Sequence, residues 1–350
     1  MTPDSADITP ATGMTGYYRR LQGAHLAPLW ESLAALAPFE PKPEARPYRW
    51  AYEEVRAHLM EAGRLITAEK AERRVVVLAN PGLAGKLQAT DTLYAGLQLI
   101  LPDEIAPAHR HSQSALRFVV EGEGAYTAVD GERTTMRPGD FIITPAWTWH
   151  DHGGGGGPVI WMDGLDVPLV GFLKAEFREE HASRAQVATR PEGDALARYG
   201  SGLLPVGMTG ARATSPVFSY PYERSREALE QLKRAGDIDP WRGLCLKYVN
   251  PTDGGWAMPT LGPTLTLLPK GFTTLPYRSV EGAVATLVEG RLRADVGGEL
   301  FELGPKDVLA LPGWTPWRLE AIEESVLFAF SDRPVYEKLG LWREERTPDA

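Results

Sequence analysis

The histidines of this chain are concentrated in one short stretch. Four of the seven lie between residues 105 and 152: His109, His111, His150 and His152. His109 and His111 are two positions apart in a segment that alternates like a β-strand, so both imidazoles point to one face. Turn signals follow at 122–124, 130–131 and 138–140. They predict an antiparallel meander that brings His150 back beside the pair. Three neutral imidazoles converging in an apolar barrel predict a metal site.

The alternative is three hydrogen-bonded core histidines without a metal. The HxH spacing and the returning third histidine favour the metal. The ligand types alone leave the ion open, because three histidines can hold Zn²⁺ with an activated water or Fe²⁺ with free positions for other ligands.

The spacing of these residues resembles the two motifs of the cupin superfamily. HxH is followed by Gly139, Pro145 and His150, but the glutamate usual in the first motif is replaced by Ala115 and Leu116. More specifically, HRHSQSALRFVVEGEGAYTAVDGE and GDFIITPAWTWHDHG resemble gentisate 1,2-dioxygenase and its relatives, the salicylate and 1-hydroxy-2-naphthoate dioxygenases. The resemblance extends from about Tyr17 to about Pro334.

The resemblance implies a bicupin with Fe(II) as cofactor. It further implies cleavage of gentisate by O₂ between the carboxyl-bearing and hydroxyl-bearing carbons, which gives maleylpyruvate. Salicylate and 1-hydroxy-2-naphthoate are alternative substrates within the family. From other classes, we consider a cupin that binds a metal or small anion without turnover, and a Zn²⁺ hydrolase or isomerase.

Arg117 is the candidate ligand for a substrate carboxylate. It follows His111 by six residues, which places both on one face of a continuous strand. A charge inside a barrel needs a partner, and a carboxylate can accept two hydrogen bonds from a guanidinium. The alternative is an outward-facing or carboxylate-paired structural arginine. The same period places Gln113 on the metal side.

Further site residues come from the resemblance. It gives His152 a substrate-binding or acid–base role, and it places Gly96, Gln98 and Arg73 in the pocket. Gln98 could hydrogen-bond a substrate hydroxyl. Asp163, Asp166 and Trp149 have no assigned role. Alternatively, His152 supports a metal ligand from behind or lies in a loop. One of the two aspartates could orient His152, and surface positions are the other possibility for both.

An internal repeat separates fold residues from functional ones. Residues 288–319 parallel 120–151, with Glu121-Gly122, Asp140, Pro145 and Trp147 repeated. We therefore interpret Trp147 as structural. The histidines are not repeated: His109 aligns with Tyr277, His111 with Ser279 and His150 with Trp317. The sequence predicts two barrels and one metal site.

The chain is expected to be mainly β, with double-stranded β-helix (jelly-roll) barrels. Its predicted parts are a helical arm (1–74), a metal-binding barrel (75–180), a linker (181–255) and a barrel without metal ligands that ends in a helix (256–350). Within them we expect disorder over 1–16, helices over 26–36, 50–65, 225–235 and 335–344, and a short turn of helix capped by Thr67. His58 is expected on a helix surface or in a subunit contact.

Composition narrows the possible partners. The net charge is −9 without a clustered basic stripe, which argues against nucleic-acid binding. One cysteine, Cys245, excludes an internal disulfide and suits a cytoplasmic location. The first residues do not form a signal peptide, and no apolar run is long enough to span a membrane. Ten tryptophans suggest large packed surfaces, and the resemblance implies a homo-oligomer, with a tetramer favoured.

Overall fold

The computed structural model describes residues 10–347, which divide into two compact units at Lys42–Pro43. The first unit holds α1 (Pro10–Gly23) and α2 (Leu29–Leu36). The disorder expected over 1–16 is therefore wrong for residues 10–16, and residues 1–9 lie outside the described part. Helix α2 begins three residues later than expected, because Pro28 is in an extended conformation at its N-cap.

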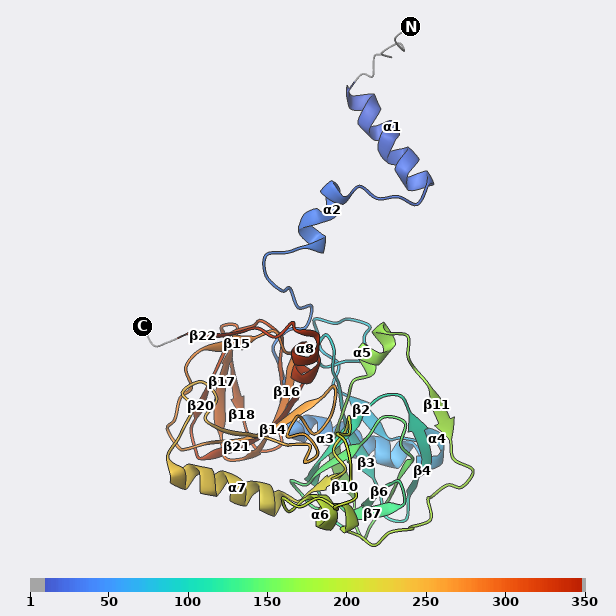
Figure 1. Cartoon of the computed structure of the whole chain (residues 1–350), viewed down its shortest axis with the longest axis vertical. Coiled ribbons are helices and arrows are strands. Elements are labelled where there is room, and N and C mark those ends of the chain that lie inside the picture. Colours follow the sequence, from blue (N-terminus) through green and yellow to red (C-terminus); the bar gives the residue numbers. More distant parts are fainter. Residues whose placement is uncertain (1–9, 348–350) are drawn as a thin grey trace. The chain divides into compact units, whose positions relative to one another are not determined.

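The second unit consists of two antiparallel barrels, drawn in teal and green and in orange and red (Figure 1). In the first barrel a six-stranded sheet ordered β12-β8-β5-β10-β3-β2 faces a five-stranded sheet ordered β11-β4-β9-β6-β7. The strands are β2 (Val75–Val77), β3 (Tyr94–Ile100), β4 (Ile105–His111), β5 (Ala115–Glu121), β6 (Tyr126–Val129), β7 (Glu132–Thr135), β8 (Phe141–Thr144), β9 (His150–Gly153), β10 (Val159–Leu165), β11 (Arg178–Glu180) and β12 (Ser219–Tyr220).

The second barrel repeats this arrangement. Its sheets are ordered β1-β19-β16-β21-β14-β13 and β18-β17-β20-β15-β22. The strands are β1 (Tyr48–Trp50), β13 (Leu244–Lys247), β14 (Gly262–Leu268), β15 (Tyr277–Ser279), β16 (Ala283–Glu289), β17 (Leu292–Val296), β18 (Glu299–Leu303), β19 (Val308–Leu311), β20 (Trp317–Ala321), β21 (Ser325–Ser331) and β22 (Glu344–Arg346). The expected mainly β, two-barrel fold is confirmed.

One apolar cluster fills the first barrel and continues into the contact between the two six-stranded sheets, whereas the interior of the second barrel forms a separate cluster. Phe118 on β5 stacks on Phe328 on β21, with ring centroids 4.2 Å apart. A Cβ on Gly164 in β10 would come within 2.6 Å of the Phe330 ring. The second barrel therefore supports the back of the strands that form the first barrel's interior.

Each barrel receives an edge strand from the segment that precedes the other. β1 lies before the first barrel in sequence but pairs with β19 of the second, and β12 lies before the second barrel but pairs with β8 of the first. With β13, these strands lie outside the predicted barrel ranges of 75–180 and 256–350. Sequence order cannot reveal this exchange, because hydrophobic patterning marks a strand but not its partner.

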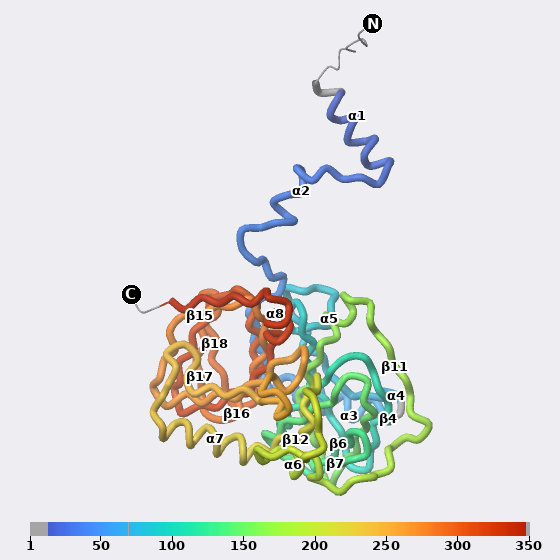
Figure 2. The backbone as a smooth tube through the Cα atoms, in the orientation of Figure 1, coloured from blue at the N-terminus to red at the C-terminus, as the bar shows by residue number. Residues whose placement is uncertain are grey.

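A helix follows each exchanged strand. α3 (Tyr52–Leu65) lies beside β2 and β3 of the first barrel, and α7 (Tyr222–Ala235) lies beside β13 and β14 of the second. Figure 2 shows the yellow α7 along the orange second barrel. The Tyr52 amide donates to Asp307 and its hydroxyl to Glu121. Tyr222 makes the equivalent bonds to Asp140 and Glu289. These crossed bonds tie each barrel to the other.

The remaining helices are short: α4 (Ala68–Ala71), α5 (Val167–Phe172), α6 (Asp194–Tyr199) and α8 (Arg333–Leu339). Thr67 caps α4 as expected, accepting a hydrogen bond from the Lys70 amide. The helix predicted over 225–235 begins three residues earlier, at Tyr222 after Pro221, and ends as expected at Ala235, before Gly236 with φ 82°. His58 is exposed on α3, as expected.

Candidate metal centre

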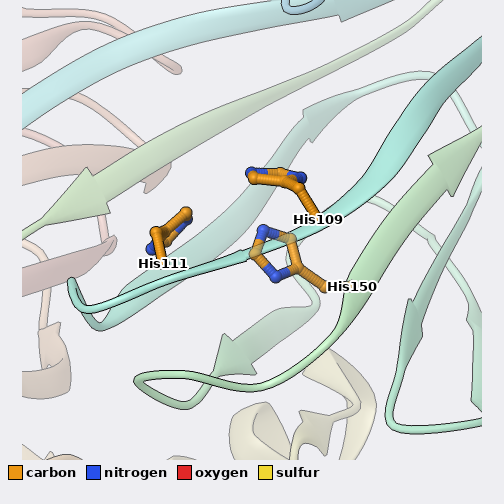
Figure 3. A group of neighbouring side chains, drawn as sticks. All are labelled: His109, His111 and His150. Carbon is orange, nitrogen blue, oxygen red and sulfur yellow. The ribbon is translucent and has the colours of Figure 1, made fainter. Parts of the chain in front are cut away.

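Three histidines converge inside the first barrel. His109 and His111 lie on β4, and His150, the first residue of β9, is paired directly with His109. One ring nitrogen from each can be chosen so that all three lie within 4.8 Å of one another. Figure 3 shows the three rings facing one another from two neighbouring strands. The alternation of β4 and the cross-strand pair thus produce the convergence expected from the sequence.

Backbone carbonyls set the direction of these rings. Nδ1 of His111 lies 2.9 Å from the Gln113 carbonyl, and Nδ1 of His150 lies 2.9 Å from the Thr148 carbonyl. A carbonyl only accepts, so each Nδ1 carries the proton and each Nε2 keeps its lone pair. Nε2 of His150 is buried without a hydrogen-bond partner among the described residues. A buried acceptor left free in this way fits a metal ion.

The rings are also kept neutral. Burial, followed by the charge of Arg73, lowers the pKa of His109 to about 2. Burial lowers the pKa of His111 to about 4, and burial together with Arg117 lowers the pKa of His150 well below its usual value. Neutral imidazoles are the form that binds a metal. Among residues 10–347 the only cluster of metal-ligand type is this triad, and it includes no carboxylate.

Arg117 faces the triad from the opposite sheet. The prediction that it shares a continuous strand with His111 is wrong, because residues 112–114 turn the chain between β4 and β5. The side chain is nevertheless buried in the barrel, where it donates to Thr144 and lies 3.4 Å from Asp163. The carboxylate-paired arginine considered from the sequence is thus present. Burial raises the pKa of Asp163 to about 6, against the effect of Arg117.

The same turn invalidates the strand argument for Gln113. It lies between β4 and β5, and its backbone carbonyl, rather than its side chain, contacts the triad through His111. Arg73 does reach the site: its guanidinium contacts Nδ1 of His109 and donates to the Pro107 carbonyl at 2.6 Å. Burial lowers the pKa of Arg73 to about 10.

His152 lies two residues beyond His150 on β9, completely buried, with the two ring centroids 6.0 Å apart. Its Nδ1 is 3.0 Å from the Thr127 hydroxyl, which donates to the sulfur of Met136. We take Nδ1 as the donor to this hydroxyl, which is the tautomer that leaves Nε2 as an acceptor. Nε2 is buried without a partner among the described residues, and burial holds the pKa of His152 well below its usual value. The ring offers a free acceptor.

Gly96 and Gln98 lie on β3, whose neighbour β10 carries Asp163 opposite Gly96 and Trp161 opposite Gln98. A Cβ on Gly96 would lie 2.6 Å from the Val75 side chain and 3.1 Å from the Tyr94 hydroxyl. The glycine thus permits close packing in this sheet. Gln98 is buried.

Asp163 and Asp166, which the sequence left without a role, have different hydrogen-bond partners. Asp163 accepts a hydrogen bond from the Trp161 indole at 3.0 Å and pairs with Arg117. Asp166 accepts from the Ser114 amide and the Thr260 hydroxyl. Both are buried, so the surface alternative is wrong. Neither hydrogen-bonds to His152, because Nδ1 of that ring is paired with Thr127 and its Nε2 has no partner among the described residues.

Of the two tryptophans near the site, Trp147 has an equivalent tryptophan in the second barrel and Trp149 has none. Trp147 and Trp314 both have positive φ, 58° and 56°, and each ring is covered by a guanidinium, that of Arg110 or Arg278. This equivalence supports a structural role for Trp147. Trp149, which has no counterpart, contacts Arg110 and His181.

Sequence reasoning missed several residues around the site: Thr127, Thr144, Trp161 and Tyr94. Thr127 and Thr144 hold His152 and Arg117. Their signal in the sequence is weak, because a threonine in a strand usually reflects β-propensity alone. Their roles become visible only from the hydrogen bonds they make to side chains on other strands.

Comparisons with known proteins identify the family of this chain. Residues 96–167 match the cupin domain family.

The chain is 52% identical to a gentisate 1,2-dioxygenase from Aquipseudomonas alcaligenes, and the match covers 94% of this chain and 95% of that one. It is 35% identical to a 1-hydroxy-2-naphthoate 1,2-dioxygenase from Nocardioides sp., covering 89% and 81%. A crystal structure of salicylate 1,2-dioxygenase from Pseudoaminobacter salicylatoxidans, as adducts with gentisate, superposes with a TM-score of 0.91 at 34% identity, covering 100% and 96%. Among the described residues, no helix is both long and apolar enough to cross a membrane.

Proposed function

Because this chain belongs to the gentisate 1,2-dioxygenase family of cupin ring-cleaving dioxygenases, we propose that it opens the ring of gentisate with O₂. The bond broken lies between the carboxyl-bearing and hydroxyl-bearing carbons. Both oxygen atoms enter the product, which is maleylpyruvate. The observation that carries this proposal is the buried triad His109, His111 and His150, within a full-length similarity of 52% identity.

The triad would hold Fe(II), which supplies electron transfer between an aromatic ring and O₂. The three histidines are neutral and no carboxylate joins them, so the protein gives the ion no compensating charge. An anionic hydroxycarboxylate substrate would balance it. Nitrogen ligands alone also suit Zn²⁺, and metal analysis of the active protein distinguishes the two ions.

Arg117 and Arg73 would bind the substrate carboxylate. The Nε of Arg117 lies 3.4 Å from Oδ1 of Asp163, and its Nη1 donates to the Thr144 hydroxyl. A guanidinium has five N–H donors, so donors remain for a ligand. Both arginines lower the pKa of the buried His152, so both charges are felt inside the barrel.

His152 would accept the proton of a substrate hydroxyl. Its Nε2 is free, its ring is neutral, and Thr127 fixes the tautomer. Because the ring stays neutral at pH 7, Nε2 is available to accept that proton from the bound substrate. Gln98 on β3 would donate a hydrogen bond to the substrate, with Gly96 and Gln113 at the edge of the pocket.

The test is O₂ uptake by Fe(II)-loaded protein offered gentisate, salicylate and 1-hydroxy-2-naphthoate in parallel. We expect gentisate to be fastest, with one O₂ consumed per ring opened. His109→Ala should lose both iron and uptake, whereas His58→Ala, at an exposed helix position, should retain both. If His109→Ala keeps iron and activity, the proposed centre is wrong.

The other substrates remain alternatives because relatives named for them are also similar. A faster rate with salicylate or 1-hydroxy-2-naphthoate would change the substrate and keep the reaction class. No uptake with any of the three, despite bound iron, would favour a cupin that binds a metal or an anion without turnover. The expected cytoplasmic location stays a prediction.

We also propose that the chain forms a homo-oligomer, with a tetramer favoured. Helix α2 has no buried residue, although Leu29, Trp30 and Leu33 are apolar and each is more than half exposed. A second copy would cover them. Light scattering after size exclusion should give a multiple of 38.4 kDa. Leu33→Glu should lower that mass and Lys42→Glu should leave it unchanged, whereas a monomeric wild type would contradict the proposal.

A further inference from the structure

Two buried aspartates occupy equivalent places in the two barrels. Asp166 follows β10 and Asp332 follows β21, and each is the N-cap residue of a short helix with proline near its start. Neither side chain caps its own helix. Both carboxylates instead bridge the barrels, so their role lies in the contacts they make away from the helix.

The contacts are equivalent bond for bond. Asp166 accepts from the Ser114 amide at 2.9 Å, within its own barrel, and from the Thr260 hydroxyl at 2.6 Å, in the segment leading to β14 of the other barrel. Asp332 accepts from the Gly282 amide at 2.9 Å and from the Thr92 hydroxyl, in the segment leading to β3. Each aspartate therefore ties a turn of its own barrel to the partner barrel.

Only the turn in the first barrel touches the metal centre. The Ser114 amide belongs to the same peptide unit as the Gln113 carbonyl, which lies 2.9 Å from Nδ1 of His111. A trans peptide unit is planar, with its N–H and its C=O pointing in opposite directions. Asp166 holds one end of this plane and His111 is bonded to the other. Fixing the amide therefore fixes the carbonyl that orients the imidazole.

We propose that Asp166, anchored by Thr260 of the second barrel, is a positioning residue for the metal ligand His111. The barrel that has lost its own ligands thereby contributes to the geometry of the remaining site. The inference rests on the metal centre proposed above. The equivalent turn of the second barrel carries Ser279 in place of His111, so the same bonds there orient no ligand.

The probe is Co²⁺ added to metal-free protein, followed by its visible absorption, which reports both affinity and ligand geometry. Thr260→Val removes the hydroxyl and keeps the side-chain shape. We expect Co²⁺ affinity to fall about tenfold, the lower range for loss of a residue that orients a ligand, and the absorption band to change. Thr260→Ser should restore both, because it returns the hydroxyl.

Thr92→Val is the matched control, since it removes the equivalent bond to Asp332. We expect the two valine variants to lower Tm by similar amounts, but only Thr260→Val to alter Co²⁺ binding. Equal Co²⁺ binding by both would overturn the proposal. If Thr260→Val does not fold, Asp166→Asn is compared with Asp332→Asn in the same way. Wild-type protein that binds Co²⁺ but consumes no O₂ would overturn the proposed function and leave this inference standing.

Discussion

At the residue scale, the site depends on groups that hold the functional side chains. His111 and His150 are oriented by backbone carbonyls, His152 by Thr127, and Arg117 by Asp163 and Thr144. These bonds lie in a buried interior, where an unpaired polar group costs more than it would at the surface. Changes to the supporting residues should therefore be measurable separately in stability and in catalysis.

The Arg117–Asp163 pair should be important for stability. Asp163→Asn leaves the buried Arg117 charge without its partner, and we expect the free energy of unfolding to fall by about 3 kcal/mol or more. Urea denaturation of the wild type and the variant measures this difference in the free energy of unfolding. Asp194→Asn, which breaks the more exposed pair with Arg198 on α6, should cost no more than about 1 kcal/mol. Equal costs would mean that Arg117 finds another partner.

The Thr127 hydroxyl should matter for turnover rather than for metal content. Thr127→Val removes the group bonded to Nδ1 of His152, so the imidazole is no longer held in one tautomer. We expect kcat with gentisate to fall about 10-fold to 100-fold while bound iron is unchanged. Thr127→Ser should recover most of the rate. An unchanged kcat in the valine variant would exclude His152 as the proton acceptor.

At the scale of elements, the barrels are joined by pairs of equivalent contacts. α3 and α7 make the same tyrosine bonds, Trp147 and Trp314 share a left-handed backbone and a stacked arginine, and Asp166 and Asp332 bridge equivalent turns. In each pair, one contact lies in or near the barrel that holds the candidate metal centre and the other in or near the second barrel. A substitution in the second contact can therefore serve as the control for the same substitution in the first.

The Asp332 bridge should make stability depend on pH. Burial raises the pKa of Asp332 to about 7, whereas an unfolded aspartate titrates near about 4. The folded state therefore binds this proton more tightly, so its contribution to stability is fully present below about pH 4 and is lost as the pH rises through about 7.

Asp332→Asn should remove this dependence. The wild type should lose on the order of 2 kcal/mol relative to the variant between pH 5 and pH 8, measured by urea denaturation at each pH. Asp253→Asn, at an exposed turn, serves as the control. A constant difference between wild type and Asp332→Asn across this range would contradict the prediction.

At the scale of the whole molecule, neither barrel is complete in its own stretch of sequence. β1 precedes the first barrel and joins the second, while β12 follows the first barrel's predicted range and joins its sheet. The phenylalanine stack between β5 and β21 lies in a core shared by both barrels. The two barrels are therefore expected to fold as one cooperative unit.

This expectation can be tested by dividing the chain in the exposed segment at Leu204. Residues 1–204 lack β12 and α7, and residues 205–350 lack β1 and α3. We expect neither fragment to give a cooperative thermal transition alone, and the two expressed together to recover O₂ uptake. A fragment that unfolds cooperatively by itself would show that the exchanged strands are dispensable.

The sequence by itself predicted the two-barrel fold and the convergence of His109, His111 and His150, because these depend on strand alternation, turn residues and an internal repeat. The tertiary structure decided which strands pair and which sheet carries each side chain. Arg117 reaches the site from the opposite sheet, Gln113 contributes a carbonyl, and Asp163 and Asp166 are buried bridges. Such roles arise from contacts between residues far apart in the chain, and a local pattern carries no information about its distant partner.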